Sequence, residues 1–389
     1  MKNKIIVGVD ISDLKVAATG QKTFLSELHT QFLSLDTKNN ANATVTSISG
    51  QNFTFVYFSS PFPIIKSRFK IALLSQHMMF QVWKQLLLPI LAWLKRCDIV
   101  FCTDYFVPYF HLGFKTVQVF HDAFFFQNSE HYNKYWFVLH KYLAMPAAKK
   151  SSFIITPSDY ALQTVHKYAG ISMDKLVRIY EAPKNLDLIE VDNNDPVLSG
   201  FIHTKYIFHV GVFEKRKNLL NLIKAYNDLI KNGSAYEQIN LVLAGKGTGR
   251  AESDVSGEII ALINELGLNN RIILTGYLTD KQLKTTYQNA LMYVFPSMNE
   301  GFGIPVLEAF KAGIPVLVAN NSCLPEIGGD AVIQFDPFNV KDIAEKMQRV
   351  IDNVDIRNDL IAKGDIRLKY FSWKQTAQEL LKVFERANQ

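Results

Sequence analysis

Short apolar runs that alternate with longer segments of helical period constrain the fold of this chain more than any other feature. They read KIIVGVD, TFVYFSS, DIVFCTD, TVQVFHD, SFIITPS and LVRIYEA in the first half, and YIFHVGV, INLVLAG, RIILTGY, LMYVFPS, IPVLVAN and AVIQFDP in the second. Because these runs do not alternate strictly between apolar and polar residues, each favours a strand that is covered on both faces. Such strands form parallel sheets between layers of helices, so the sequence predicts an α/β fold.

The segments between the runs have the period of helices. Helices are expected at residues 21–35, 218–231, 257–266, 280–290 and 340–353, and another is expected to start near Pro305. The last stretch, residues 371–389, predicts an amphipathic helix.

The length of 389 residues suits two domains better than one core. Residues 186–200 mix Asp, Asn, Pro and Gly without a clear period, which is typical of a linker. We therefore predict a Rossmann-like domain at residues 1–185, a linker at 186–200 and a second Rossmann-like domain at 201–370. A ligand is expected in a cleft between the domains, beyond the carboxyl ends of the strands.

The composition is that of a globular protein, with 48% hydrophobic and 20% charged residues. Lys and Arg are scattered rather than gathered in the stripe of a nucleic-acid binder, and the net charge of +6 also suits a surface that touches anionic lipid. The sequence shows no signal peptide and no window of roughly 18 apolar residues. Three cysteines, an odd number, predict reduced thiols. Together these features predict a cytoplasmic protein.

The stretch PSMNEGFGIPVLEAF places two acids around a glycine turn at the start of a helix. The amides of residues 301–303 at a helix N-terminus favour an anion such as a phosphate. Glu308, about one turn into the helix, can reach a hydroxyl near that phosphate, and Glu300 can bind a second polyol. A sugar nucleotide offers all of these groups, although a capped helix with a surface glutamate explains the same stretch.

Two further motifs follow strands of the second half. Arg216 and Lys217 precede a helix, where adjacent cations can neutralise a leaving diphosphate, although a solvated basic turn is an alternative. Gly245 and Lys246 follow another strand but lack the spacing of a Walker loop, so that turn chemistry explains them equally well.

The first half carries two candidate positions. His121 closes a strand and can bind a sugar hydroxyl, with Asp122 orienting the loop, or can serve a structural role only. Gly20 lies at an expected helix start, where backbone amides can hold the acceptor or a diphosphate, and a plain strand-to-helix loop is the alternative.

The second half resembles a retaining glycosyltransferase of the family 4 type, also called glycosyltransferase group 1, which has the two-domain GT-B fold. The resemblance rests on GVFEKRKNL, LVLAGKG, LTGYLTDKQLKTTYQNALMYVFPS, NEGFGIPVLEAFKAGIPVLVAN and LPEIGGDA, and more loosely on FHD and TGQKTFLSEL in the first half. The segment IYEAPKN departs from the Asn-Gly that the family usually has after this strand, and TGQKTFLSEL keeps a single glycine. The resemblance also implies that the closing helix at residues 371–389 packs back on the N-terminal domain.

The resemblance implies roles for individual residues. Glu300 would lie near the donor sugar, Glu308 would bind the nucleotide ribose, and Arg216 with Lys217 would bind the donor diphosphate. His121 would lie at the transferred sugar. The remaining binding positions that the resemblance implies are Gly20, Gly211, Gly245, Lys246, Leu278, Gly301, Phe302, Gly303 and Ile304.

The implied activity is transfer of a hexosyl-type sugar from a nucleoside-diphosphate sugar, UDP- or GDP-linked, with retention at the anomeric carbon. The acceptor would be a saccharide or a lipid-linked saccharide, as in the synthesis of bacterial cell-surface polysaccharide. No Asp-x-Asp motif precedes the donor loop, so neither a metal ion nor another cofactor is expected. A same-fold sugar-nucleotide epimerase and a non-catalytic sugar-nucleotide binding protein remain alternatives.

The segment Arg68–Arg96 is unusually rich in Leu, Met and Trp and has basic ends. This pattern suits an interfacial helix in peripheral contact with the inner face of a membrane. An ordinary buried helix pair explains it as well.

Overall fold

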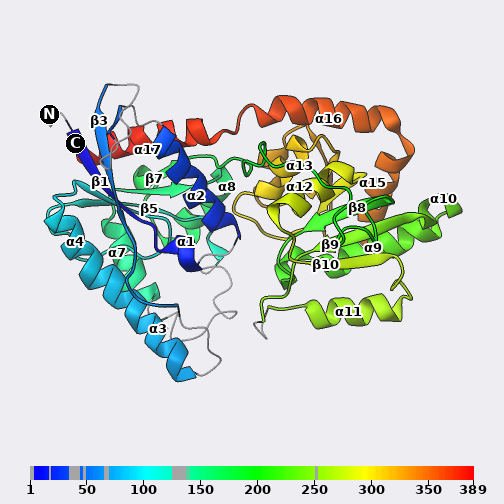
Figure 1. Cartoon of the computed structure of the whole chain (residues 1–389), viewed down its shortest axis with the longest axis horizontal. Helices are drawn as coiled ribbons and strands as arrows, with labels where there is room; N and C mark the ends of the chain where they lie inside the picture. Colours follow the sequence, from blue (N-terminus) through cyan, green and yellow to red (C-terminus); the bar gives the residue numbers. More distant parts are fainter. Residues whose placement is uncertain are drawn as a thin grey trace. The chain divides into compact units, whose positions relative to one another are not determined.

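The structure, a computed structural model, divides into two compact units (Figure 1). It describes residues 4–16, 19–34, 44–46, 50–64, 70–124, 138, 140–249 and 253–389. The first unit comprises residues 1–181 together with 372–389, and the second comprises residues 182–371.

The first unit is built on a seven-stranded sheet of order β2-β3-β1-β4-β5-β6-β7. All neighbouring strands are parallel except β2, which runs antiparallel to β3. The strands are β1 (Lys4–Asp10), β2 (Thr44–Thr46), β3 (Asn52–Phe58), β4 (Ile99–Cys102), β5 (Lys115–Val119), β6 (Phe153–Thr156) and β7 (Leu176–Arg178).

Helices cover both faces of this sheet. Along β4, Phe101 packs against Phe384 of α17, while its neighbours Val100 and Cys102 belong to the core that contains Trp83 and Leu88. Because successive side chains of a strand point to opposite faces of the sheet, β4 contributes to one hydrophobic core on each face. The helical elements are α1 (Asp13–Val16), α2 (Thr19–Ser34), α3 (Lys70–Val82), η1 (Trp83–Leu87), α4 (Leu88–Leu94), η3 (His140–Ala144), α7 (Met145–Lys150), α8 (Asp159–Thr164), η4 (Val165–Ala169), η5 (Met173–Lys175) and α17 (Trp373–Asn388).

The second unit is built on a six-stranded parallel sheet of order β10-β9-β8-β11-β12-β13. Its strands are β8 (Lys205–Val210), β9 (Ile239–Ala244), β10 (Ile272–Gly276), β11 (Met292–Phe295), β12 (Val316–Ala319) and β13 (Val332–Phe335). Its helical elements are η6 (Lys215–Lys217), α9 (Leu219–Lys231), α10 (Ser234–Glu237), α11 (Ser256–Glu265), α12 (Asp280–Asn289), α13 (Ile304–Lys311), α14 (Leu324–Gly328), α15 (Val340–Asp352) and α16 (Val354–Leu368).

Every apolar run of the sequence contains a strand, so the predicted α/β fold is confirmed. The expected helices correspond to α2, α9, α11, α12, α13, α15 and α17. The sequence analysis missed β2, a three-residue edge strand with no apolar run to mark it.

The stretch expected as a linker, residues 186–200, forms part of the second unit. The ammonium of Lys284 donates to the carbonyl oxygens of Leu186 and Ile189, and the backbone amide of Asp192 donates to Thr285 Oγ1. The chain passes from one unit to the other between Glu181 and Ala182, a few residues before the expected boundary.

The closing helix α17 returns to the first unit, where it packs on α2 and lies against β4 and β5. Ser372 caps its N-terminus by accepting a hydrogen bond from the amide of Gln375. The buried face of α17 includes Leu380, Leu381 and Phe384, so the amphipathic pattern of the sequence marks this contact.

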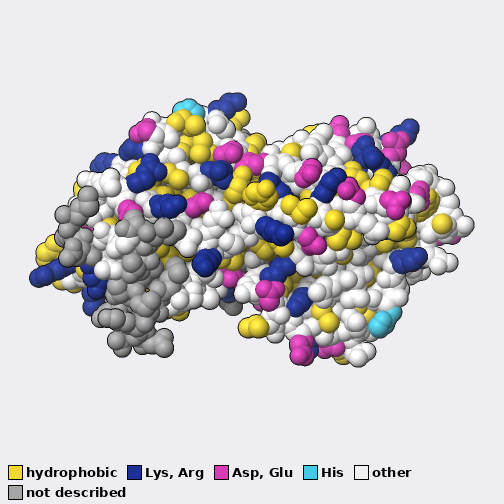
Figure 2. All heavy atoms as spheres, turned by 90° about the horizontal axis from the view of Figure 1, so that it is seen from above, with side chains coloured by type: hydrophobic (Ala, Val, Ile, Leu, Met, Phe, Trp, Pro, Cys, Tyr) yellow, Lys and Arg dark blue, Asp and Glu magenta, His cyan; other side chains and the backbone are white. Residues whose placement is uncertain are grey.

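Surface charges of both signs are mixed over the face drawn in Figure 2, as the scattered charges of the sequence predict. The three cysteines are buried free thiols. None of the helices in the described part of the chain is long and apolar enough to cross a membrane.

Candidate functional site

Loops after neighbouring parallel strands of the second unit carry most of the predicted donor residues. In this sheet β8 lies between β9 and β11. β8 leads to the turn η6, β9 leads to Gly245, and β11 leads to the loop that contains Glu300. Because the carboxyl ends of parallel strands meet at one edge of a sheet, these loops gather there.

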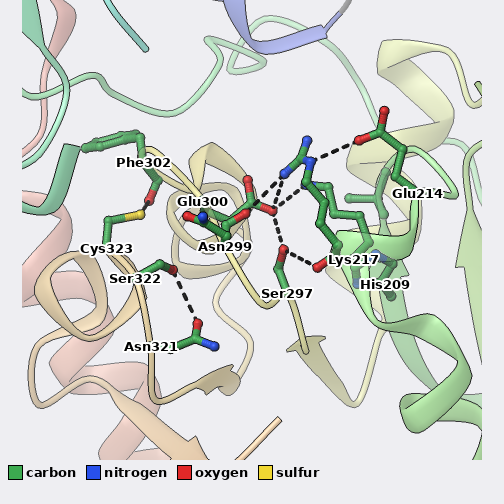
Figure 3. Close-up of polar contacts among 12 residues, drawn as sticks. His209, Glu214, Lys217, Ser297, Asn299, Glu300, Phe302, Asn321, Ser322 and Cys323 are labelled. Carbon is green, nitrogen blue, oxygen red and sulfur yellow. Dashed lines mark hydrogen bonds and ion pairs between the residues drawn. The ribbon is translucent and has the colours of Figure 1, made fainter. Parts of the chain in front are cut away.

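Glu300 is the centre of a cluster of charged contacts (Figure 3). Its Oε1 atom lies 2.6 Å from Lys217 Nζ and 3.0 Å from Arg216 Nη1. Ser297 Oγ donates to the same oxygen at 2.5 Å. The side chains of Glu300 and Lys217 are only 11% and 10% exposed. The structure therefore brings three of the predicted catalytic residues together.

Two hydrogen bonds to backbone carbonyl oxygens join the Glu300 loop to η6. The amide of Met298 donates to the carbonyl oxygen of Arg216 at 2.8 Å, and Arg216 Nη1 donates to the carbonyl oxygen of Asn299 at 3.3 Å. Arg216 Nε also pairs with Glu214 Oε2 at 2.9 Å. The two cations are thus held by two carboxylates, Glu214 and Glu300.

The environment of Glu300 fixes its charge. Burial favours the neutral acid, but Arg216, Lys217 and the hydrogen bonds from Lys217 and Ser297 outweigh burial and lower the pKa of Glu300 to about 2. Burial lowers the pKa of Lys217, opposed by Glu300. Glu300 is therefore a carboxylate at neutral pH. It is paired with the two cations that were expected, from the sequence, to bind a phosphate.

His209 is a residue of this site that the sequence analysis did not single out. It is fully buried in β8, where its Nδ1 lies 2.9 Å from the carbonyl oxygen of Val294. Burial lowers the pKa of His209 to about 4, so the ring is neutral and Nδ1 carries the proton. Its Nε2 has no hydrogen-bond partner among the described residues. Only its position at the end of a strand, before Gly211, could have signalled it.

Gly211 and Gly245 meet at this edge of the sheet. A Cβ atom on Gly245 would lie 1.8 Å from the carbonyl oxygen of Gly211, and the φ of Gly245 is +136°. A Cβ atom on Gly211 would lie 3.2 Å from His209 Nε2. Both positions thus keep the backbone of the β8 and β9 loops close together beside Lys217.

The turn between Glu300 and α13 contains Gly301, Phe302 and Gly303. Gly303 takes a left-handed conformation with a φ of +102° and is the N-cap of α13. The carbonyl oxygen of Phe302 accepts a hydrogen bond from Cys323 Sγ at 3.0 Å, and Phe302 itself is buried (Figure 3). Ile304, also buried, starts the helix. The helix start expected near Pro305 is confirmed.

Glu308, in α13, forms a separate contact with α12. Its Oε2 atom accepts a hydrogen bond from the hydroxyl of Tyr287 at 3.1 Å. Burial raises the pKa of Glu308 to about 7, although the Tyr287 hydrogen bond and Lys184 oppose the shift. The two glutamates of the motif thus differ in character, since Glu300 is charged and paired with cations whereas Glu308 titrates near neutrality.

Two predicted positions lie at the ends of β9 and β10. Lys246 is exposed directly after Gly245, and its backbone carbonyl accepts a hydrogen bond from the amide of Phe213. Leu278 is buried between Gly276, the last residue of β10, and Thr279, the N-cap of α12. Neither side chain joins the Glu300 cluster.

In the first unit, His121 follows β5 and contacts Glu181, which follows β7. His121 Nδ1 lies 2.9 Å from Glu181 Oε1. Burial disfavours the imidazolium, but the hydrogen bond and charge of Glu181 outweigh it and raise the pKa of His121. Gly20 lies in the first turn of α2, and the next residue, Gln21, donates to Asp13 Oδ2 and to the carbonyl oxygen of Thr103.

A buried ionic network lies at the carboxyl ends of β1 and β4. Lys84 Nζ is 2.8 Å from Asp10 Oδ2 and 2.8 Å from Asp104 Oδ1, and Trp83 Nε1 donates to Asp10. Lys84 comes from η1, within the apolar segment that the sequence analysis discussed only as an interfacial or buried helix. This network explains the single basic residue in the middle of that segment.

Comparisons with known proteins agree with this fold. A family model described as Glycosyl transferases group 1 matches residues 199–367. The serotype-specific mannosyltransferase WbdA of Escherichia coli is 28% identical over 309 residues, which are 74% of this chain and 37% of that protein. The O-antigen chain mannosyltransferase B of Escherichia coli is 28% identical over 72% of each chain. This chain thus spans little more than a third of the length of WbdA.

Solved structures show the same fold at low sequence identity. HepE of Anabaena, solved in complex with UDP-glucose, has a TM-score of 0.70 and 16% identity and covers 98% of this chain and 99% of its own. WaaG, a glycosyltransferase involved in lipopolysaccharide biosynthesis, has a TM-score of 0.68 and 13% identity, with 97% and 99% covered. These likenesses confirm the predicted GT-B fold class. Through residues 199–367, this chain is similar to the glycosyl transferases group 1 family.

Proposed function

We propose that this protein transfers a sugar from a nucleoside-diphosphate sugar to a saccharide or lipid-linked saccharide, with retention at the anomeric carbon. The observation that carries the proposal is the Glu300 cluster, in which Arg216 and Lys217 converge on one buried carboxylate at the carboxyl edge of the sheet. A hydroxyl-binding acid that lies within 3.0 Å of two phosphate-binding cations matches the chemistry of a sugar diphosphate.

The cluster suggests how the donor binds. A diphosphate brings two or more negative charges, so it competes with Glu300 and Glu214 for the cations. Once Arg216 and Lys217 turn toward the phosphates, Glu300 Oε1 is free to accept a hydrogen bond from a sugar hydroxyl. The cations then stabilise the diphosphate as it leaves, and we propose that this step needs no metal ion.

Other residues complete the proposed binding mode. Glu308, with Tyr287 fixing one of its oxygens, would accept hydrogen bonds from the ribose, and the turn from Gly301 to Gly303 would offer backbone amides to the phosphates. His121 would act at the transferred sugar. The departing phosphate would help to deprotonate the acceptor hydroxyl on the same face, which accounts for retention without a covalent intermediate.

The relatives support a role in surface polysaccharide synthesis. WbdA and the O-antigen chain mannosyltransferase B are mannosyltransferases, HepE has been solved with UDP-glucose, and WaaG is involved in lipopolysaccharide biosynthesis. We therefore propose a UDP- or GDP-linked hexose as the donor and a growing bacterial surface saccharide as the acceptor. A cytoplasmic location at the inner face of the membrane follows from that role.

A thermal-shift panel of UDP-, GDP-, ADP- and dTDP-sugars tests the proposal. Sugar nucleotides that carry one particular base are expected to raise the melting temperature of the protein by several degrees at saturating concentration. Lys217→Met should abolish the shift for the sugar nucleotide, while Lys341→Met, an exposed lysine of α15, should leave it unchanged. No stabilisation by any sugar nucleotide would contradict the proposal, and conversion of the donor alone to an isomer would favour an epimerase.

We further propose that the helical run formed by α3, η1 and α4 contacts an anionic membrane surface. One face of this run is buried, through Trp83, Leu88 and Ala92. Six apolar residues spaced four positions apart, each 37% to 62% exposed, form what we call the apolar stripe: Leu74, Met78, Val82, Leu86, Ile90 and Leu94. The run ends at the exposed cations Lys95 and Arg96. Arg68, the start of the segment in the sequence analysis, lies outside the described residues.

A further inference from the structure

Glu181 and His121 form a pair that the family resemblance does not supply. His121 Nδ1 is 2.9 Å from Glu181 Oε1, and the side chain of Glu181 is 4% exposed. Glu181-Ala182 stands where the family usually has Asn-Gly. An asparagine at this position would be neutral, whereas Glu181 places a buried carboxylate beside His121.

The position of Glu181 is fixed by the residues before it. The amide of Ile179 donates to the carbonyl oxygen of Thr156 at 2.9 Å. Thr376 Oγ1, from α17, donates to the carbonyl oxygen of Tyr180 at 2.7 Å. These anchors on β6 and α17 leave the carboxylate of Glu181 little freedom to move away from His121.

His121 is fixed as well. The amide of Phe120 donates to the carbonyl oxygen of Ile155 at 2.8 Å, and the ring of Phe24 packs edge-on against the imidazole at 5.2 Å. The carboxylate of Asp122 accepts hydrogen bonds from the hydroxyl of Tyr105 and the amide of Phe124, which orders the loop. The remaining ring nitrogen, Nε2, has no partner among the described residues.

We propose that Glu181 is a positioning residue that holds His121 as an imidazolium with Nε2–H directed at an anionic or hydroxyl oxygen of the bound sugar donor. This inference rests on the proposed function for the identity of that ligand. With Nδ1–H engaged by Glu181, the ring has one donor left, and a charged donor makes a stronger hydrogen bond to oxygen than a neutral one.

The charges around His121 agree with this role. Three carboxylates act on it: Glu181 after β7, Asp122 in its own loop and Asp13 of α1. The uncharged ring of Phe24, from α2, packs on His121, and Trp373 of α17 packs on Phe24. Burial alone would lower the pKa of His121, and the carboxylates raise it, with Glu181 first among them. Removal of the Glu181 charge should therefore release the proton at a lower pH.

The pair can be tested without any sugar donor. The pKa of His121, followed by NMR of the imidazole nitrogens and assigned by comparison with His121→Gln, is expected to fall by about one unit or more in Glu181→Gln. Glu379→Gln, on α17 and paired with Gln375, is the matched control and should leave it unchanged. An unchanged His121 pKa in Glu181→Gln would overturn the inference even if the protein transfers sugar.

Kinetics then test whether the pair acts in transfer. Glu181→Gln should lower kcat by about tenfold at pH 8 and less at pH 6, because the variant loses the imidazolium proton at a lower pH than wild type does. A merely structural role would lower kcat equally at both pH values. The double variant with His121→Gln should be no slower than His121→Gln alone, and multiplied losses would refute a role for Glu181 through His121.

Discussion

Lys217 and Arg216 reach the same oxygen of Glu300, and this shared contact changes the roles that the sequence suggests. The sequence places the acids and the cations in separate loops, so it predicts the cations on a phosphate and Glu300 on a sugar. The structure shows the charge of Glu300 offset by both cations. Under the proposed function, a donor diphosphate must displace this contact.

Residue identities at the site were predictable, but their pairings were not. When Glu, Arg-Lys or His-Asp follows an apolar run, these polar residues can be expected at the carboxyl edge of a parallel sheet. The partner of His121 is 60 positions away at Glu181, and no local pattern marks it. Likewise, nothing in HVGVF reveals that His209 is buried against the carbonyl oxygen of Val294.

Glu308 gives a prediction for stability. Its pKa is raised from 4.5 to about 7 in the folded protein, so the folded state binds a proton that the unfolded state has lost between these values. Its contribution to stability is therefore lost as the pH rises from about 4.5 to 7 and stays lost above 7. Denaturation at pH 8 should show Glu308→Gln more stable than wild type by about 1–2 kcal/mol after allowance for solvent screening.

The same comparison at pH 4 is the control, because Glu308 is then neutral in both states and the two proteins should unfold together. Glu345→Gln, an exposed glutamate of α15, should match wild type at both pH values. Equal stability of Glu308→Gln and wild type at pH 8 would show that burial does not perturb this carboxyl.

At the scale of elements, the strands were predictable because buried parallel strands are uniformly apolar. The segment from α3 to α4 was not, because its sequence is apolar on all sides and periodicity cannot assign a buried face. In the structure, Trp83 and Leu88 of this segment are buried, whereas the residues of the apolar stripe are exposed. The π-helical turn η1 and the buried Lys84–Asp10 pair were also beyond sequence patterns.

The apolar stripe predicts binding to anionic vesicles. Wild-type protein should sediment with vesicles of phosphatidylglycerol and phosphatidylcholine, and the double variant Met78→Glu/Leu86→Glu should sediment several-fold less, because each glutamate adds a charge that anionic lipid repels. Both side chains are more than half exposed, at 62% and 56%, so the fold should tolerate the change.

Ile260→Glu is the matched control, since this isoleucine of α11 is 51% exposed in the other unit. It should sediment like wild type. Membrane contact through the stripe is excluded if wild type stays in the supernatant or if the double variant sediments equally well.

At the scale of the whole molecule, the division of the chain into two units could be predicted from the sequence only in part. The two halves of similar α/β type were visible from the order of apolar runs. The first unit also includes residues 372–389. The buried face of α17 packs them on that unit, and no break in composition marks this return of the chain. The polar stretch at 186–200 resembles a linker, yet its carbonyl groups are bound by Lys284.

Acceptor-dependent transfer is the most direct test of the central claim that the Glu300 cluster moves a sugar. With the stabilising sugar nucleotide and a saccharide acceptor, wild type should release nucleoside diphosphate and form a product with the donor's anomeric configuration, read by NMR. Glu300→Gln should lower kcat by about a hundredfold or more, while Glu345→Gln keeps wild-type activity. Full activity in Glu300→Gln, or an inverted product, would contradict the account.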